Sequence, residues 1–169
     1  MSTLRVDNIQ DQGGAERRGL KTYAIICDQK TQNTDGGTFT DGAWQTRDLN
    51  TEIADPDSIV SISNNQFTLG AGSYLITANA PAYDVDQHQA RLYNATTSSV
   101  VQAGQSTYAD SANNGSNSAI VLARVTITSD TAFEIQHRST TTKPSNGFGV
   151  GADLGAEEIY TIVQIFKEA

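Results

Sequence analysis

The chain has 169 residues, a length that suits one compact domain. Hydrophobic residues make up 37% and charged residues 18%, a balance typical of turn-rich β proteins. The net charge of −8 argues against nucleic acid as a partner, because phosphates require clusters of Lys and Arg. It also argues against docking on an anionic membrane. We therefore expect a protein that binds neither nucleic acid nor membrane.

The first twenty residues differ from the rest, because isolated apolar residues stand among polar ones and no core can form there. Leu4, Val6 and Ile9 are these apolar residues, and Arg5 lies between two of them. The segment is expected either to fray or to serve as an arm that adds a strand to a partner. It lacks the pattern of a signal peptide, so we expect no ordinary secretion.

Residues 21–169 show short strand patterns and no helical period. Strands are expected at 21–27, 44–49, 59–62, 67–69, 73–80, 89–94, 100–101, 118–127, 131–138 and 158–166, with a tight turn at 64–65 and a short edge segment at 148–150. Residues 104–117 are expected to be the least structured stretch, with a mobile loop at 111–117, and a hairpin is expected across 128–130. About ten short strands predict an all-β, two-sheet jelly-roll sandwich behind a short extended N-terminal arm. Residues 1–20 form the arm and residues 21–169 the jelly-roll domain.

The central stretch runs from Phe67 to Pro81. A Gly70–Gly72 turn leads into a strand whose Tyr74 and Ile76 share one face, since side chains alternate along a strand. Pro81 is expected to end this strand because it has no N–H to donate.

The last strand is apolar on both faces, which is unusual for a strand with one wet face. One face carries Tyr160, Ile162, Gln164 and Phe166. One face can pack into the sandwich, and the other needs a second surface. A second copy of the chain is the expected cover, and the chain's own loop is the alternative.

The sequence shows only weak signs of a catalytic site or a metal site. Cys27, in an apolar run, is expected to be a buried small hydrophobe. His88 and His137 are the only histidines, too few for a zinc site, and are expected to make polar pairs with neighbours such as Arg91, Arg138 and Glu134. No cofactor, metal or enzymatic activity is predicted. Trp44 is expected to be a core or interface anchor, although a sugar-stacking role stays open for it and for Phe148.

Several stretches together resemble a known family: Gly42–Thr51, Asn65–Tyr74, Ala80–Ala82, Gln89–Asn94, Phe133–His137 and Glu158–Val163. They are similar to the jelly-roll domains of bacteriophage structural proteins, which are akin to the globular heads of complement and of tumour-necrosis-factor-like proteins. The opening Ser2–Gln10 resembles the start of phage fibre and virion surface proteins. The resemblance implies a homotrimer, with the last strand and the Tyr74 strand near the threefold axis.

The favoured hypothesis is a capsid decoration protein on the surface of a tailed-phage virion, made in the host cytoplasm. Its partners would be its own copies and the major capsid protein or another virion protein. Leu4, Arg5, Val6 and Ile9 would contact the particle. The subunit interface would contain Tyr74, Ile76, Tyr160, Ile162, Gln164 and Phe166.

Two alternatives remain. The first is the receptor-binding head of a tail fibre, whose loops would contact a glycan or protein of the host surface. Its candidate loop residues are Asp84, Asp86, Asn113, Asn114, Lys143 and Phe148. The second is a polysaccharide hydrolase, which needs an acidic pair, and Glu134, Asp84 and Asp86 are the candidates.

Overall fold

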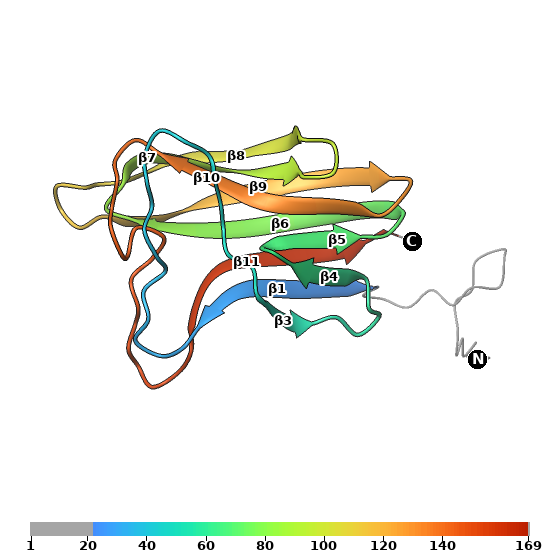
Figure 1. The fold of residues 1–169 in the computed structure, drawn as a ribbon, viewed down its shortest axis with the longest axis horizontal. Helices are drawn as coiled ribbons and strands as arrows, with labels where there is room; N and C mark the ends of the chain where they lie inside the picture. Colours follow the sequence, from blue (N-terminus) through green and yellow to red (C-terminus); the bar gives the residue numbers. More distant parts are fainter. Residues whose placement is uncertain (1–21, 169) are drawn as a thin grey trace, which may run out of the picture.

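The computed structural model describes residues 22–168, and within this range all regular structure is β (Figure 1). The strands are β1 (Tyr23–Lys30), β2 (Gln45–Thr46), β3 (Thr51–Ala54), β4 (Val60–Ser63), β5 (Gln66–Leu69), β6 (Gly72–Tyr83), β7 (Asp86–Asn94), β8 (Ser99–Ala109), β9 (Ser116–Ile127), β10 (Thr131–Ser139) and β11 (Glu158–Lys167). No helix in the described range is long and apolar enough to cross a membrane.

The strands form two antiparallel sheets that face each other. One sheet has the order β3-β1-β11-β6-β9, and the other has the order β4-β5-β10-β7-β8 with β2 added against β10. Strands adjacent in the chain repeatedly lie in opposite sheets, as in β5 and β6 or β9 and β10. This arrangement confirms the predicted two-sheet jelly roll. The predicted arm residues Leu4, Arg5, Val6 and Ile9 lie outside the described residues.

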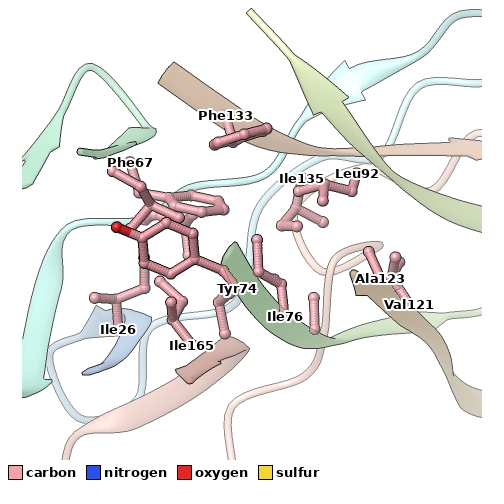
Figure 2. Close-up of a cluster of buried hydrophobic side chains, with 14 of the residues drawn as sticks. Ile26, Phe67, Tyr74, Ile76, Leu92, Val121, Ala123, Phe133, Ile135 and Ile165 are labelled. Carbon is pink, nitrogen blue, oxygen red and sulfur yellow. The ribbon is translucent and has the colours of Figure 1, made fainter. Parts of the chain in front are cut away.

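The core lies between the sheets and is built from alternate residues of each strand. Figure 2 shows Tyr74 and Ile76 of β6 among side chains from both sheets, with Phe67 and Phe133 on the opposite side. The Phe67 and Phe133 rings stack with centroids 5.7 Å apart. A second, smaller cluster surrounds Phe39 near the long loops.

The β4–β5 hairpin forms as its sequence predicts. Asn64 and Asn65 both have positive φ, at 52° and 62°, which suits a two-residue hairpin turn. Ser63 then faces Gln66 across the hairpin. Asn tolerates this backbone region better than most residues, so the turn fixes the register of the two strands.

Pro81 does not end its strand, which is a correction to the sequence prediction. β6 continues to Tyr83, and Pro81 lies opposite Ser118 of β9. On its other side, the pairing of β6 with β11 extends only to Asn79. Beyond that point no described strand pairs with this side of β6, so a residue without an N–H is tolerated there.

Three further expectations are corrected. Residues 104–117, expected to be the least structured stretch, are strand at both ends, because β8 reaches Ala109 and β9 begins at Ser116, and the predicted 111–117 loop corresponds to the turn between them. β9 and β10 do not form a hairpin, since the 128–130 connection crosses from one sheet to the other. Residues 148–150 form no strand, and Phe148 instead donates its N–H to the carbonyl of Gly37 at 3.1 Å.

Candidate functional site

The outer face of the five-stranded sheet exposes large apolar side chains. Leu122 is 64% exposed, Leu75 46%, Ile120 41% and Phe166 37%. The strand register places them in neighbouring rows across β11, β6 and β9. Phe166 pairs with Leu75 across the β11–β6 ladder. Leu75 pairs with Arg124 of β9, and Leu122 lies two residues from Arg124, opposite Thr77. Polar residues lie among them on the same face, namely Thr77, Asn79, Gln164 and the 61% exposed Arg124. Exposed apolar side chains gathered on one sheet face mark a candidate interaction surface.

A hollow of about 270 Å³ lies in the middle of this face. It is lined by Thr77, Asn79, Ile120, Ile162 and Gln164. Two of the predicted interface residues of β11, Ile162 and Gln164, therefore lie beside the exposed residues of β6 and β9. Small polar residues in the floor and apolar residues around it give the face a shape that could receive a protruding side chain.

Two predicted interface residues, Tyr74 and Ile76, require a correction. Both are 0% exposed and point into the sandwich (Figure 2). The Tyr74 hydroxyl donates to the carbonyl of Gly70 at 2.9 Å. Strand alternation then puts Leu75 and Thr77 on the outer face, so these are the residues of β6 available to a second subunit.

Tyr160 is covered by the chain's own loops. Its hydroxyl donates to the carbonyl of Thr34 at 2.7 Å, and the side chain is 6% exposed. A Cβ on Gly149 would lie 2.4 Å from the Tyr160 ring, so only glycine lets this loop approach. The doubly apolar last strand is thus covered by loops at one end, half-buried at Ile162 and exposed at Phe166.

The predicted surface loops are held by internal hydrogen bonds. Asp84 is buried and pairs with Lys143. Asp86 accepts hydrogen bonds from the Ser111 backbone N–H at 3.0 Å and the Thr141 hydroxyl at 2.6 Å. These donors lower the pKa of Asp86 to about 2. Both carboxylates therefore tie the β6–β7 connection to neighbouring loops.

The other candidate loop residues differ in exposure. Asn113 and Asn114 are exposed; Asn113 donates to Asp110 at 2.7 Å, and Asn114 accepts from the Tyr83 hydroxyl at 3.1 Å. Phe148 is half-buried, and its ring packs 4.5 Å from Phe39, centroid to centroid. Phe148 is therefore a packing residue of the smaller cluster.

A buried arginine joins the two sheets at the loop end of the sandwich. Arg47 is 0% exposed and its backbone N–H binds the carbonyl of Ile135 in β10. Its side chain crosses the interior and donates to the Thr161 hydroxyl at 2.7 Å, the Pro81 carbonyl at 3.2 Å and the Phe148 carbonyl at 3.0 Å. Burial lowers the pKa of Arg47 to about 9.

The two histidines form a buried pair beside Arg47. His88 Nδ1 lies 2.9 Å from His137 Nε2, and the His137 ring packs against Phe39. Burial, followed by the charge of Arg47, lowers the pKa of His88 to about 4. The same causes and His88 hold the pKa of His137 well below its ordinary value. Both rings are therefore neutral at pH 7, as polar packing residues.

The remaining residues considered for catalysis or metal binding make structural contacts. Glu134 is 8% exposed and accepts a hydrogen bond from Gln66, while Asp84 and Asp86 are engaged as described above. Cys27 is buried, as predicted, and burial raises the pKa of its thiol. Within residues 22–168 no group of three His, Cys, Asp or Glu side chains is placed to hold a metal.

An open hollow of about 600 Å³ lies on the outer face of the six-stranded sheet. Its floor contains outward-facing side chains of β10, β7 and β8, which are Arg138, Gln87, Gln89 and Ser106. Its wall is the 41–44 segment with Trp44. The sequence singles out Trp44 but does not show that it lies beside β10, β7 and β8, since that placement depends on the register between the three strands.

Comparison with known proteins found no matching family model and no matching curated protein. Solved structures do match. The globular domain of zebrafish complement 1qA protein aligns with a TM-score of 0.50 and 12% identity, covering 86% of this chain and 96% of that one. Murine APRIL at pH 5.0 aligns with a TM-score of 0.52 and 7% identity, covering 86% of this chain and 99% of that one. The chain therefore has the jelly-roll fold of complement-head and tumour-necrosis-factor-like proteins.

Proposed function

We propose that the chain is the self-assembling head of a phage virion surface protein, a homotrimer that decorates the capsid. The observation that carries the self-assembly is the exposed apolar face of the five-stranded sheet. Leu75, Ile120, Leu122 and Phe166 would each lose contact with water in an assembly, at about 25 cal/mol per Å² of apolar area buried. A second copy of the chain is the occupant that we assign to this face.

The edge of the sandwich supplies a complementary surface. Val100 and Tyr108, near the two ends of β8, are 51% and 50% exposed, and Gly104 in the middle of β8 lies against Ile120 of β9. A contact between the sheet face of one copy and the β8–β9 edge of the next is head-to-tail. Such contacts close into a ring when the rotation between copies permits, and three copies agree with the family resemblance of the sequence.

The virion role rests on the resemblance of residues 2–10 and of the strand motifs to phage structural proteins. In this role the trimer would cross-link capsid subunits, and residues 1–20 would attach it through backbone hydrogen bonds and apolar contacts. The proposed work is binding, with no reaction. Acidic surface charge suits this role, because like-charged particles do not adhere to one another.

The test is a binding experiment with phage particles produced without this protein. The full-length chain is expected to bind these particles and sediment with them. A variant without residues 1–20 should keep the same mass in solution and lose particle binding. If the truncated variant binds equally well, the arm does not attach the protein. If the full-length chain ignores particles but binds host cells, the receptor-binding alternative replaces decoration.

A further inference from the structure

We propose that the hollow on the outer face of the six-stranded sheet is a binding site for an acidic saccharide. Trp44 would provide the stacking surface and Arg138 would bind the carboxylate of a uronic or sialic acid. The site lies on the outer face of the six-stranded sheet, whereas the proposed assembly face is the outer face of the five-stranded sheet. This proposal does not depend on the virion role; it assigns a ligand-binding site that the proposed function does not include.

The size and shape of the hollow suit a small ligand. Its volume of about 600 Å³ falls within the roughly 300–1,000 Å³ that is usual for ligand sites. It is a groove between the 41–44 wall and the sheet floor, and not a closed cavity. Saccharides bind well in such grooves, because one sugar ring can lie on an aromatic side chain while its neighbours remain in solvent.

Trp44 is held in place from one side. The guanidinium carbon of Arg91 lies 3.9 Å from the centre of the Trp44 ring, and the Arg91 Nε donates to Gln136 Oε1 at 2.7 Å. Gln136 in turn donates to Glu134. This chain of contacts fixes the indole before a ligand arrives. Pre-positioned aromatic rings lose little entropy on binding, which favours affinity.

The wall that carries Trp44 is also fixed by hydrogen bonds to the β10 side. The backbone of Phe39 exchanges two hydrogen bonds with Lys143, and the Gly42 N–H donates to the Ser139 carbonyl. The Asp41 N–H donates to the Thr142 hydroxyl at 3.0 Å. The groove is therefore a built feature of the fold, with both sides anchored.

The floor offers hydrogen-bonding groups that the described part of the chain leaves available. Gln89 uses its amide N–H groups on the Gly104 carbonyl and the Ser106 hydroxyl, so its Oε1 is the remaining acceptor. Gln87 Oε1 accepts from the Thr140 hydroxyl at 2.7 Å, so its Nε2 is the remaining donor. A donor and an acceptor on adjacent outward positions of β7 match the paired hydroxyls of a sugar ring.

The groove is lined by the cation Arg138 and by the carboxylate Asp41, which accepts a hydrogen bond from the Thr142 hydroxyl at 2.9 Å. Arg138 is the group that would bind the ligand's carboxylate. It is exposed in the groove and makes no ion pair with any residue in the range 22–168. Its planar guanidinium binds carboxylates through two parallel hydrogen bonds. Gln89 lies opposite Arg138 across the β10–β7 ladder, so a sugar carboxylate at Arg138 would place its ring hydroxyls over Gln89.

The experiment uses the full-length protein on an array that pairs each uronic or sialic acid glycan with its neutral counterpart, such as the methyl ester. We expect binding to carboxylated glycans and at least a tenfold weaker signal for the esters. Titration calorimetry on the best glycan should show that Trp44→Ala and Arg138→Gln each weaken binding tenfold or more. Glu157→Gln is the matched control, because it removes an exposed charge in the loop before β11, outside the residues that line the groove.

Three results would overturn the proposal. The first is an array on which the wild-type protein binds no carboxylated glycan. The second is binding only to neutral glycans, which would remove the role of Arg138. The third is glycan binding that Trp44→Ala and Arg138→Gln leave unchanged while both variants keep the wild-type circular dichroism spectrum. Trp44→Phe retains an aromatic face, so it should keep more affinity than Trp44→Ala.

Discussion

Arg47 connects several parts of the interior from one buried position. The residue follows β2 in the chain, and its guanidinium donates to Thr161 of β11, to the carbonyl of Pro81 in β6 and to the carbonyl of Phe148. It lies 4.0 Å over the Phe148 ring. A buried cation is tolerated here because three oxygen acceptors surround it.

Truncation of Arg47 should therefore be strongly destabilising. Arg47→Ala leaves the carbonyls of Pro81 and Phe148 without their donor and opens a cavity, and we expect the free energy of unfolding to fall by about 3 kcal/mol or more. Urea unfolding followed by circular dichroism measures this. Arg124→Ala, an exposed arginine, should change stability by less than about 0.5 kcal/mol. Equal effects of the two variants would contradict the role of Arg47.

The buried histidine pair predicts a pH dependence of stability. The pKa of His88 is about 4 in the folded protein and about 6.5 when unfolded. Between these values the unfolded chain binds a proton that the folded one does not, so stability is full above pH 6.5 and falls as the pH drops. From pH 7 to pH 5 we expect a loss of about 2 kcal/mol from His88, with a further loss from His137.

Urea unfolding at pH 7, 6 and 5 measures this loss. Asp86 and Glu158, whose pKa values are lowered, do not contribute to this loss between pH 7 and pH 5, since carboxylates protonate near pH 4 and lower. The double variant His88→Gln, His137→Gln should flatten the curve between pH 7 and 5. A wild-type curve that is already flat would show that the pair titrates normally.

At the scale of elements, the close approach of β8 to β9 closes one side of the sandwich. Gly104 of β8 allows it, because an added Cβ would lie 2.6 Å from the Ile120 carbonyl oxygen and 2.8 Å from Val121 Cγ2. Neither neighbour can yield easily, since one is backbone and the other is packed in the core. β8 must therefore stay free of side-chain bulk at this position.

The variant Gly104→Ala tests this contact. We expect it to lower the free energy of unfolding by about 1–3 kcal/mol, because the strands must separate to admit the methyl group. Gln105→Ala, at the next and exposed position, should have little effect. Thermal unfolding of both variants gives the comparison. A Gly104→Ala protein as stable as wild type would mean that β8 does not pack as closely as described.

Much of the fold could be predicted from the sequence because turns and alternation are local. The two asparagines of the β4–β5 turn and the alternation of β6 and β11 appear directly in the residues. The choice of sheet for each strand is not local, so β9 and β10 were expected to pair. The same limit applies to Tyr74 and Ile76, since alternation groups residues on one face without saying which face is inside.

In the candidate sites, too, features set by local sequence could be predicted and features set by distant contacts could not. The doubly apolar β11 pointed to an assembly face, but its loop-covered end at Tyr160 depends on contacts more than a hundred residues apart in sequence. Arg47 looked like an ordinary residue of a weak strand, because a single charged residue carries no sign that it will be buried. The groove at Trp44 required the register of three strands.

At the scale of the whole molecule, the outer face of the five-stranded sheet should decide assembly. Leu122→Lys places a charge at its most exposed apolar position and should convert the assembly to monomers, because a buried unpaired charge is costly. Leu154→Lys is the matched control, since Leu154 is 87% exposed in the loop before β11. Light scattering should show a loss of mass for the first variant only. Loss in both, or in neither, would argue against this face.

The most direct test of the central claim is the mass of the wild-type protein in solution, measured by light scattering coupled to size exclusion. Self-assembly through the apolar face predicts a single species at three times the 18.0 kDa of one chain, stable on dilution into the micromolar range. A monomer at these concentrations would contradict the proposal, because the exposed face of β11, β6 and β9 would then have no second copy to cover it.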